Sequence, residues 1–166
     1  GGGAEGGADV GRHTVGEAVE TDDGCVLGIG VGGTAAKVGV FIEGGVLLSR
    51  HAFASVPVRA DGSYAKLSEG YGAMLSRVGI DANRIVSIGL AVPGTVAAED
   101  SLKLCPNIDL DLRAYKSFLH AEFGRATVCV LNDADAAVLG DMWKGSAGER
   151  GVKTFALLTL GTGVGA

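Results

Sequence analysis

Short apolar runs separated by glycine-rich turns open the patterned part of the chain. Residues Cys25–Val31 are apolar and glycine-spaced and predict a buried strand, and Ala36–Ile42 and Val46–Phe53 predict two more. The segment Glu43-Gly44-Gly45 is typical of a hairpin turn. Strands joined by turns this short must run antiparallel, since a parallel pair needs a long crossover connection.

Helical and strand patterns then alternate to the end of the chain. Ser63 can cap a first helix, whose apolar residues recur at helical spacing as far as Val78. The later elements follow in the order strand Arg84–Val92, helix Asp111–Phe123, strand Thr127–Leu131, helix Asn132–Trp143 and strand Thr154–Leu160. The order βββαβαβα plus one further strand predicts an α/β fold, with parallel later strands in a mixed sheet and helices on both faces.

The composition divides the chain into three parts. Residues 1–24 hold eight glycines and several acidic side chains but few apolar ones, so we expect a disordered leader. Residues 25–150 contain most of the predicted elements and form one expected domain. Residues 151–166 carry one strand and a glycine-rich end, which we interpret as the start of a second domain.

Charge and cysteine content exclude several classes of protein. The formal net charge of -5 argues against a role in coating nucleic acid, which needs a basic face. No apolar run reaches the ~18 residues of a membrane span, and no secretory signal pattern opens the chain. Three scattered cysteines without a CxxC motif predict free thiols, a reducing cytoplasmic compartment and no zinc site within this chain.

The first glycine cluster, residues 28–33, literally matches the GxGxxG fingerprint of dinucleotide-binding proteins. That fingerprint works only where a helix follows, because the helix N-terminus holds the pyrophosphate. Here a strand is predicted instead, and the acidic residue expected further along is missing. A plain structural turn is one alternative. The better fit is a strand–turn–strand in which the backbone N–H groups of Gly32 and Gly33 and the Thr34 hydroxyl face a phosphate.

A second turn of the same construction follows the last predicted strand. Gly161, Thr162 and Gly163 repeat the combination of glycine and threonine after an apolar run. Two such turns, far apart in the chain, suggest two walls of one phosphate cleft. Lys37 projects from the second predicted strand, where it can approach the phosphate or remain a solvated lysine.

Polar residues follow two of the predicted parallel strands. Asn132 and Asp133 come directly after strand Thr127–Leu131, and the carboxyl ends of parallel strands are where ligands bind in open α/β sheets. The alternative is a purely local role, with Asn132 as a helix cap and Asp133 as an acid that compensates the helix dipole. Gly94 follows the strand Arg84–Val92, and Asn107 further on can exchange hydrogen bonds with sugar hydroxyls.

Together these segments resemble the ROK family of sugar kinases, within the actin-like ATPase (ribonuclease-H-like) superfamily. The resemblance extends from residue 25 to the end of the chain and rests on the order and spacing of five segments. These are LGIGVGGTAAKVGVF (27–41), IGLAVPGTV (88–96), LCPNIDL (104–110), VLNDADAAVLGDMWKG (130–145) and LLTLGTGVGA (157–166).

The resemblance implies ATP-dependent phosphorylation of a hexose, with glucose as the expected substrate, ATP and Mg²⁺ as cofactors and a homo-oligomeric enzyme. It implies an ATP phosphate site formed by Gly32, Gly33, Thr34, Lys37, Gly161, Thr162 and Gly163. It implies a sugar site lined by Gly94, Asn107, Asn132 and Asp133. In this interpretation Asp133 is the general base that accepts the proton of the attacking hydroxyl.

The chain departs from the family pattern in side chains and in length. The family usually carries an aspartate, associated with hydrated magnesium, where this chain has Gly30, and commonly a polar residue where it has Ala35. The family's zinc segment, adenine pocket and remaining sugar ligands would lie beyond Ala166. We therefore expect the 166-residue chain by itself to be inactive.

Two alternatives to a kinase remain within the same family. One is a sugar-responsive transcriptional regulator, which would need a DNA-binding helical domain that residues 1–24 are too few to form. The other is a sugar-binding relative with impaired catalysis, motivated by Gly30.

Overall fold

The computed structural model describes residues 24–33, 35–54, 63–97, 101–103, 108, 110–157, 159–160 and 164–165. The expected leader therefore lies almost wholly outside the described residues. The strands are β1 Cys25–Val31, β2 Ala35–Ile42, β3 Val46–Ala54, β4 Ile85–Val92, β5 Thr95–Ala97, β6 Ser101–Lys103, β7 Thr127–Asn132, β8 Thr159–Leu160 and β9 Val164–Gly165. The helices are α1 Ser63–Arg77, α2 Leu112–Phe123, α3 Asp133–Lys144 and α4 Ser146–Glu149, with 3-10 turns at Glu43–Gly45 and Ala82–Arg84.

Five strands form one mixed sheet in the order β3-β2-β1-β4-β7. The hairpin partners β1–β2 and β2–β3 are antiparallel, whereas β1–β4 and β4–β7 are parallel. Short turns permit only antiparallel pairing, and the helical crossovers α1 and α2 permit the parallel pairs. The predicted mixed sheet is confirmed.

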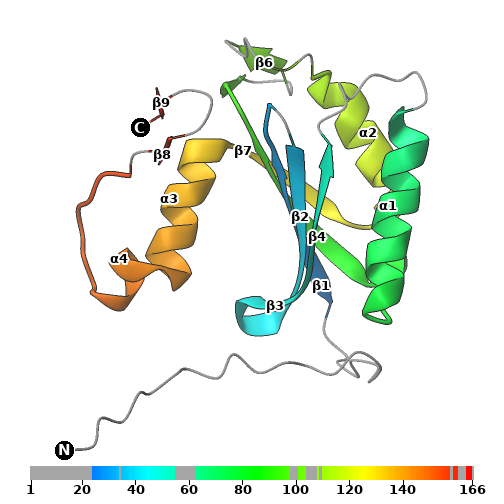
Figure 1. Cartoon of the computed structure of the whole chain (residues 1–166), viewed down its shortest axis with the longest axis horizontal. Helices are drawn as coiled ribbons and strands as arrows, with labels where there is room; N and C mark the ends of the chain where they lie inside the picture. The colour runs from blue at the N-terminus through cyan, green and yellow to red at the C-terminus, as the bar shows by residue number, and fades with distance from the viewer. Residues whose placement is uncertain are drawn as a thin grey trace, which may run out of the picture.

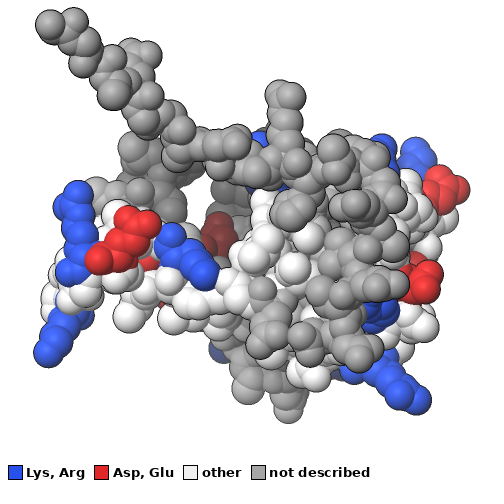
Figure 2. All heavy atoms as spheres, turned by 90° about the horizontal axis from the view of Figure 1, so that it is seen from below, with Lys and Arg blue, Asp and Glu red and all other residues white. Residues whose placement is uncertain are grey.

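Helices cover both faces of this sheet, as predicted. Figure 1 shows α1 and α2 against one face and α3, followed by α4, on the other. None of the described helices is long and apolar enough to cross a membrane. On the face of the molecule seen in Figure 2, lysine and arginine side chains lie beside acidic ones at both sides of the view.

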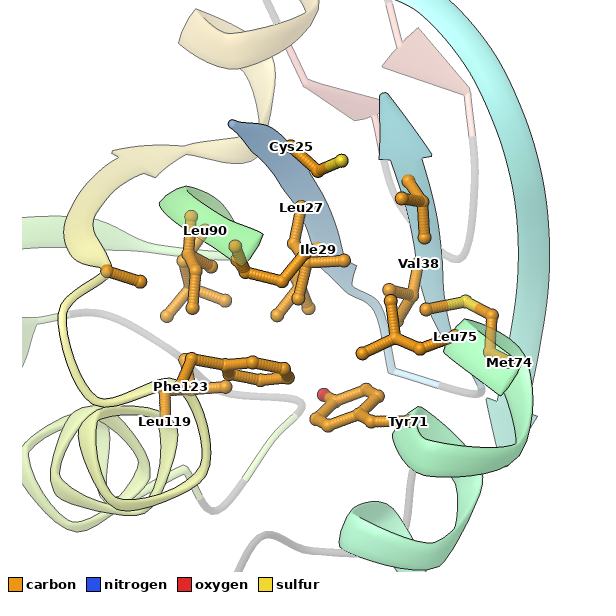
Figure 3. Close-up of a cluster of buried hydrophobic side chains, with 14 of the residues drawn as sticks. Cys25, Leu27, Ile29, Val38, Tyr71, Met74, Leu75, Leu90, Leu119 and Phe123 are labelled. Carbon is orange, nitrogen blue, oxygen red and sulfur yellow. The ribbon is translucent and has the colours of Figure 1, made fainter. Parts of the chain in front are cut away.

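The hydrophobic core lies between the sheet and helices α1 and α2. Alternate residues of β1, including Leu27 and Ile29, are buried on this side. They pack with Tyr71 and Met74 of α1 and with Leu119 of α2, and Figure 3 shows these side chains converging on one cluster. Each half-buried strand thus uses its two-residue repeat to send one row of side chains into the core.

The end of the described chain differs from the prediction. Residues 154–157 lie in neither helix nor strand, and only Thr159–Leu160 is a strand, paired antiparallel with Val164–Gly165. The predicted strand Thr154–Leu160 is therefore wrong over most of its described length. An apolar run becomes a strand only where a neighbouring strand takes its hydrogen bonds, and here the partner is a two-residue segment. The β5–β6 hairpin and α4 were not predicted.

Candidate functional site

The three parallel strands of the sheet end at a common edge. Gly30, Ala91 and Leu131 are neighbours in one row across β1, β4 and β7. The residues that follow each strand therefore emerge at the same level. The tertiary structure in this way brings the Gly32-Gly33 turn, Gly94 and the Asn132-Asp133 pair to one edge of the sheet.

Asn132 ties two of these strand ends together. Its side-chain Nδ2 donates a hydrogen bond of 2.8 Å to the carbonyl oxygen of Gly94, and Val92 is its register partner. Its Oδ1 accepts hydrogen bonds from the backbone N–H groups of Ala134, at 2.8 Å, and Asp135, at 3.3 Å. The helix cap that the sequence suggested is confirmed, and the same side chain also holds the neighbouring loop in place.

Gly94 supplies the backbone geometry that this contact needs. Its φ of 90° lies in the left-handed region, which side chains other than hydrogen rarely allow. The turn after β4 can therefore present its carbonyl oxygen to Asn132. The sequence named both residues as site candidates but gave no indication that they bind each other.

Asp133 begins α3 at the same edge and is exposed. One carboxylate oxygen accepts a hydrogen bond of 2.9 Å from the backbone N–H of Ala134. Within the described part of the chain the other oxygen has no hydrogen-bond partner. The arrangement offers a fixed carboxylate with one oxygen open to a ligand.

The turn between β1 and β2 is tight and has little side-chain bulk. The backbone N–H of Gly32 donates to the carbonyl oxygen of Ala35 at 3.0 Å, and a Cβ on Gly32 would lie only 3.0 Å from that same oxygen. Gly33 is exposed, with no heavy atom near the position of an added Cβ. A strand, not a helix, follows this turn, so the dinucleotide-binding interpretation is wrong.

Lys37 and Gly30 lie opposite each other on β2 and β1. Lys37 is exposed and, among the described residues, has no ion-pair partner. No heavy atom lies within 4 Å of a Cβ built on Gly30, so this position is open as well as uncharged. Lys37 therefore places a positive charge on the strand next to the end of β1.

The structure leaves part of the predicted site untested. Thr34, Asn107, Gly161, Thr162 and Gly163 lie outside the described residues, so their roles at the phosphate and sugar sites stay predictions.

One feature of this region was missed from the sequence. On the face of the sheet away from α1 and α2, an apolar groove is lined by Gly30 and Gly89 and, near one end, by Lys37 and Arg50. The sequence did carry a sign of this groove. Gly28 and Gly30 alternate along the first predicted strand, and glycines inside strands mark places where another group approaches the backbone closely.

A mixed sheet with helices on both faces, and glycine turns and acidic residues at the carboxyl edge of its parallel strands, defines the actin-like ATPase fold. Within this class the ROK family model matches residues 26–166, and the chain belongs to the ROK family.

Individual relatives agree with this assignment. Glucokinase from Streptomyces coelicolor is 34% identical over 145 residues, which cover 86% of this chain and 42% of that protein. Glucokinase from Halalkalibacterium halodurans is 31% identical over 145 residues, with coverages of 84% and 42%. The crystal structure of a ROK family glucokinase from Streptomyces griseus, in complex with glucose and AMPPNP, superposes with a TM-score of 0.62 at 29% identity, covering 86% of this chain and 43% of that one. The chain thus spans less than half the length of these proteins.

Proposed function

We propose that this chain is the N-terminal part of an ATP-dependent hexose kinase whose substrate is glucose. In this proposal the chain contributes the general base, Asp133. The observation that carries the proposal is the free carboxylate oxygen of Asp133, held at the carboxyl edge of the sheet beside the contact between Asn132 and Gly94. The names of the similar proteins, two glucokinases and a glucokinase bound to glucose, support the choice of sugar.

The chemistry assigned to these residues is an in-line phosphoryl transfer. A sugar hydroxyl attacks the γ-phosphorus of ATP, the bond from that phosphorus to the bridging oxygen breaks, and ADP leaves. The free oxygen of Asp133 accepts the hydroxyl proton. The hydrogen bond between Asn132 and Gly94 holds the turn after β4 against the start of α3 at the proposed sugar site. Asn107 is assigned to the hydroxyl groups of the sugar.

The nucleotide phosphates are assigned to the turn between β1 and β2. The backbone N–H of Gly33 and the hydroxyl of Thr34 are assigned to one wall, and Gly161–Gly163 to the other. Gly32, whose N–H donates to the carbonyl oxygen of Ala35, keeps the turn tight. Lys37 is the register partner of Gly30, and we assign it to add positive charge beside this turn, on the β2 side.

Mg²⁺ fits this site only as a partner of the nucleotide. Enzymes of this chemistry hold the ion with one or two carboxylates plus phosphate oxygens and water. Among the described residues no group of three or more His, Cys, Asp or Glu side chains could hold a metal ion, and Gly30 contributes no ligand. We assign Mg²⁺ to the ATP phosphates, where it supplies charge neutralisation when bound.

The test is Asp133→Asn in the complete protein, assayed by coupled detection of glucose 6-phosphate. The amide keeps a hydrogen-bond acceptor but takes up no proton, so we expect kcat to fall by about 10²–10⁴-fold. Glucose binding, followed by calorimetry, should change much less. Asp135→Asn is the matched control, because it removes the other exposed acid from the first turn of α3.

Turnover of Asp133→Asn within about tenfold of the parent protein would contradict the assignment, because a general base contributes more than that. A comparable loss in Asp135→Asn would show that helix charge, rather than proton transfer, sets the rate.

A second function is favoured by one observation, the bare Gly30. The complete protein would then be a sugar-binding relative with impaired catalysis. Calorimetric binding of glucose by a complete protein that forms no glucose 6-phosphate would support this alternative over the kinase.

A further inference from the structure

Two cationic side chains, Lys37 and Arg50, stand on the same face of the main sheet. The five strands of this sheet contain no aspartate or glutamate, and these two residues are their only lysine and arginine. The acids at the start of α3, Asp133 and Asp135, lie at the far end of the carboxyl edge. The edge is therefore positive on the side of β2 and negative on the side of β7.

Lys37 stands beside the turn to which we assign the nucleotide phosphates. The register pair that closes this turn is Val31 with Ala36, and the next pair is Gly30 with Lys37. Residues directly opposed on antiparallel strands share a face, and their Cβ positions are about 4.5–5.5 Å apart. The flexible four-carbon stem of Lys37 can therefore carry its ammonium group across Gly30 to the turn.

The space over Gly30 is open. Apart from its neighbours in the chain, no heavy atom of the described residues lies within 4 Å of a Cβ built there, and the next residue in the row is the small Ala91. One row further from the turn, the neighbours across β2, β1, β4 and β7 are three glycines and a cysteine: Gly39, Gly28, Gly89 and Cys129. The sheet thus leaves room for the Lys37 side chain and offers no carboxylate that would hold it elsewhere.

Arg50 favours the orientation of Lys37 towards the turn. Arg50 is the register partner of Gly39, which lies two residues after Lys37 on β2, so the two cations share a face and are diagonal neighbours. Diagonal neighbours are about 7–8 Å apart, within reach of long side chains. Because like charges repel, the ammonium group is favoured away from Arg50, and that direction leads past Gly30 to the turn.

The groups at this end of the site suit phosphate oxygens better than a metal ion. Proteins that bind Mg²⁺ together with phosphates usually hold the ion with one or two carboxylates. The strands here supply none, and the described residues contain no group of three or more His, Cys, Asp or Glu side chains that could hold an ion. An ammonium group beside a backbone N–H is instead a combination that binds phosphate.

We propose that Lys37 contacts the nucleotide phosphates and makes their binding at this turn independent of a metal ion held by the protein. Its ammonium group donates hydrogen bonds to phosphate oxygens beside the backbone N–H of Gly33. The nucleotide is then bound with or without Mg²⁺. The proposal rests on the assignment of the nucleotide to this turn in the proposed function.

The experiment is a calorimetric titration of ATP into the complete protein, once in excess EDTA and once in excess Mg²⁺. Lys37→Met removes the charge and keeps a long side chain. In EDTA we expect this variant to raise the Kd for ATP by about 10–100-fold, since one charge-assisted contact is lost. In Mg²⁺ the rise should be smaller, because the ion offsets part of the phosphate charge. Lys37→Arg keeps the charge and should retain most of the binding in EDTA.

Further variants separate a direct contact from a general effect of positive charge. Lys66→Met removes an exposed lysine from α1, on the other face of the sheet, and should change the Kd by less than about twofold because salt screens distant charges. Arg50→Met removes a cation further from the turn and should raise the Kd much less than Lys37→Met. Adenosine, which has no phosphate, should bind the parent protein and Lys37→Met equally. Thermal melting checks folding, and Lys37→Gln is a second uncharged variant.

The results that overturn this proposal differ from those that overturn the kinase function. Equal Kd values in EDTA for the parent protein and Lys37→Met would overturn the contact, even in a protein that phosphorylates glucose. So would an equal loss in Arg50→Met, or a parent protein that binds ATP in Mg²⁺ but not in EDTA. Selective loss of ATP binding in Lys37→Met, from a parent protein that does not phosphorylate glucose, would support the contact and contradict the kinase. A parent protein that binds ATP under neither condition would overturn both.

Discussion

At the scale of single residues, Asn132 and Asp111 show how one local pattern serves two different purposes. Both precede a helix, and both accept hydrogen bonds from its first turn. Asp111 does this through a 2.9 Å bond from the backbone N–H of Ala114. Asn132 has an amide nitrogen as well, and that nitrogen reaches Gly94 from a different strand end. The amide, unlike a carboxylate, can donate and accept at once, and this makes Asn132 part of the candidate site.

Gly30 stands where the resemblance to the ROK family leads us to expect an aspartate, and this expectation can be tested. The position is open, and its cross-strand neighbour is Lys37, so Gly30→Asp should fold normally and place a carboxylate beside that ammonium group. If the missing carboxylate limits the site, turnover of the complete protein should rise by at least about tenfold at saturating Mg²⁺. Coupled assays across a magnesium titration, together with thermal melting, measure both effects.

Gly140→Asp is the control for the added charge, since it lies at another open and exposed position, on α3. A stably folded Gly30→Asp protein with an unchanged rate and an unchanged magnesium response would show that the bare glycine does not limit this site.

At the scale of elements, α1 and α2 are joined by buried tyrosines. The hydroxyls of Tyr71 and Tyr115 hydrogen-bond to each other at 2.5 Å, and Ser68 donates to Glu122 at 2.8 Å nearby. Burial raises the pKa of Tyr71 to about 12. Burial, and then the neighbouring Tyr71, raise the pKa of Tyr115 well above its usual range. Burial thus disfavours a phenolate at this contact, so the folded state keeps both hydroxyls protonated to higher pH than an unfolded chain does.

These pKa shifts predict a loss of stability in alkali. Below pH ~10, the pKa of tyrosine in an unfolded chain, both states are protonated and the stabilisation is complete. As the pH rises from about 10 towards 12, the unfolded state loses its protons first, so the free energy of unfolding falls. Urea denaturation at pH 8 and pH 11 measures the drop.

The double variant Tyr71→Phe/Tyr115→Phe provides the comparison, because it keeps the rings and removes both titrating hydroxyls. Its stability should fall less between the two pH values than that of the parent chain. Identical pH dependence in the two proteins would show that the tyrosine pair does not govern alkaline unfolding. Tyr71→Phe alone should cost about 1–3 kcal/mol, since it leaves the buried Tyr115 hydroxyl without its partner.

At the scale of the whole molecule, we expect the carboxyl edge of the sheet to form one side of a cleft. That edge gathers Gly33, Gly94 and Asp133, while the two-residue strand β8 pairs with Val164–Gly165. The relatives are more than twice as long as the matched segment, since that segment is 42% of their length. The rest of such a protein is expected to supply the adenine pocket and the opposite wall.

This predicts that residues 1–166 alone do not phosphorylate glucose. Without the opposite wall, ATP and sugar are not held in line, and correct positioning accounts for much of the rate of phosphoryl transfer. A coupled glucose 6-phosphate assay on the purified 166-residue chain, beside the protein extended through its reading frame, tests the point. Circular dichroism must show that the short chain is folded. Turnover by the short chain in the usual kinase range of about 1–100 s⁻¹ would contradict the prediction.

The sequence by itself determined the five strands of the main sheet and helices α1 to α3, because burial leaves apolar runs and helical spacing in the chain. Apolar runs identified β1 and β4, the spacing around Tyr71 identified α1, and Asn132 and Asp133 at the end of β7 identified both a helix cap and a site candidate. The glycine turn before β2 was likewise read correctly as a link between strands, since no helical pattern follows it.

Only the tertiary structure decided how these pieces meet. Hydrogen bonding between strands is not local, so the row from Gly39 to Cys129, and with it the apolar groove, could not be assembled from any one segment. The contact between Asn132 and Gly94 joins residues that are distant in sequence. The apolar run from Thr154 failed as a strand for the same reason: side-chain pattern gives the tendency to extend, and the available partner decides whether the strand forms.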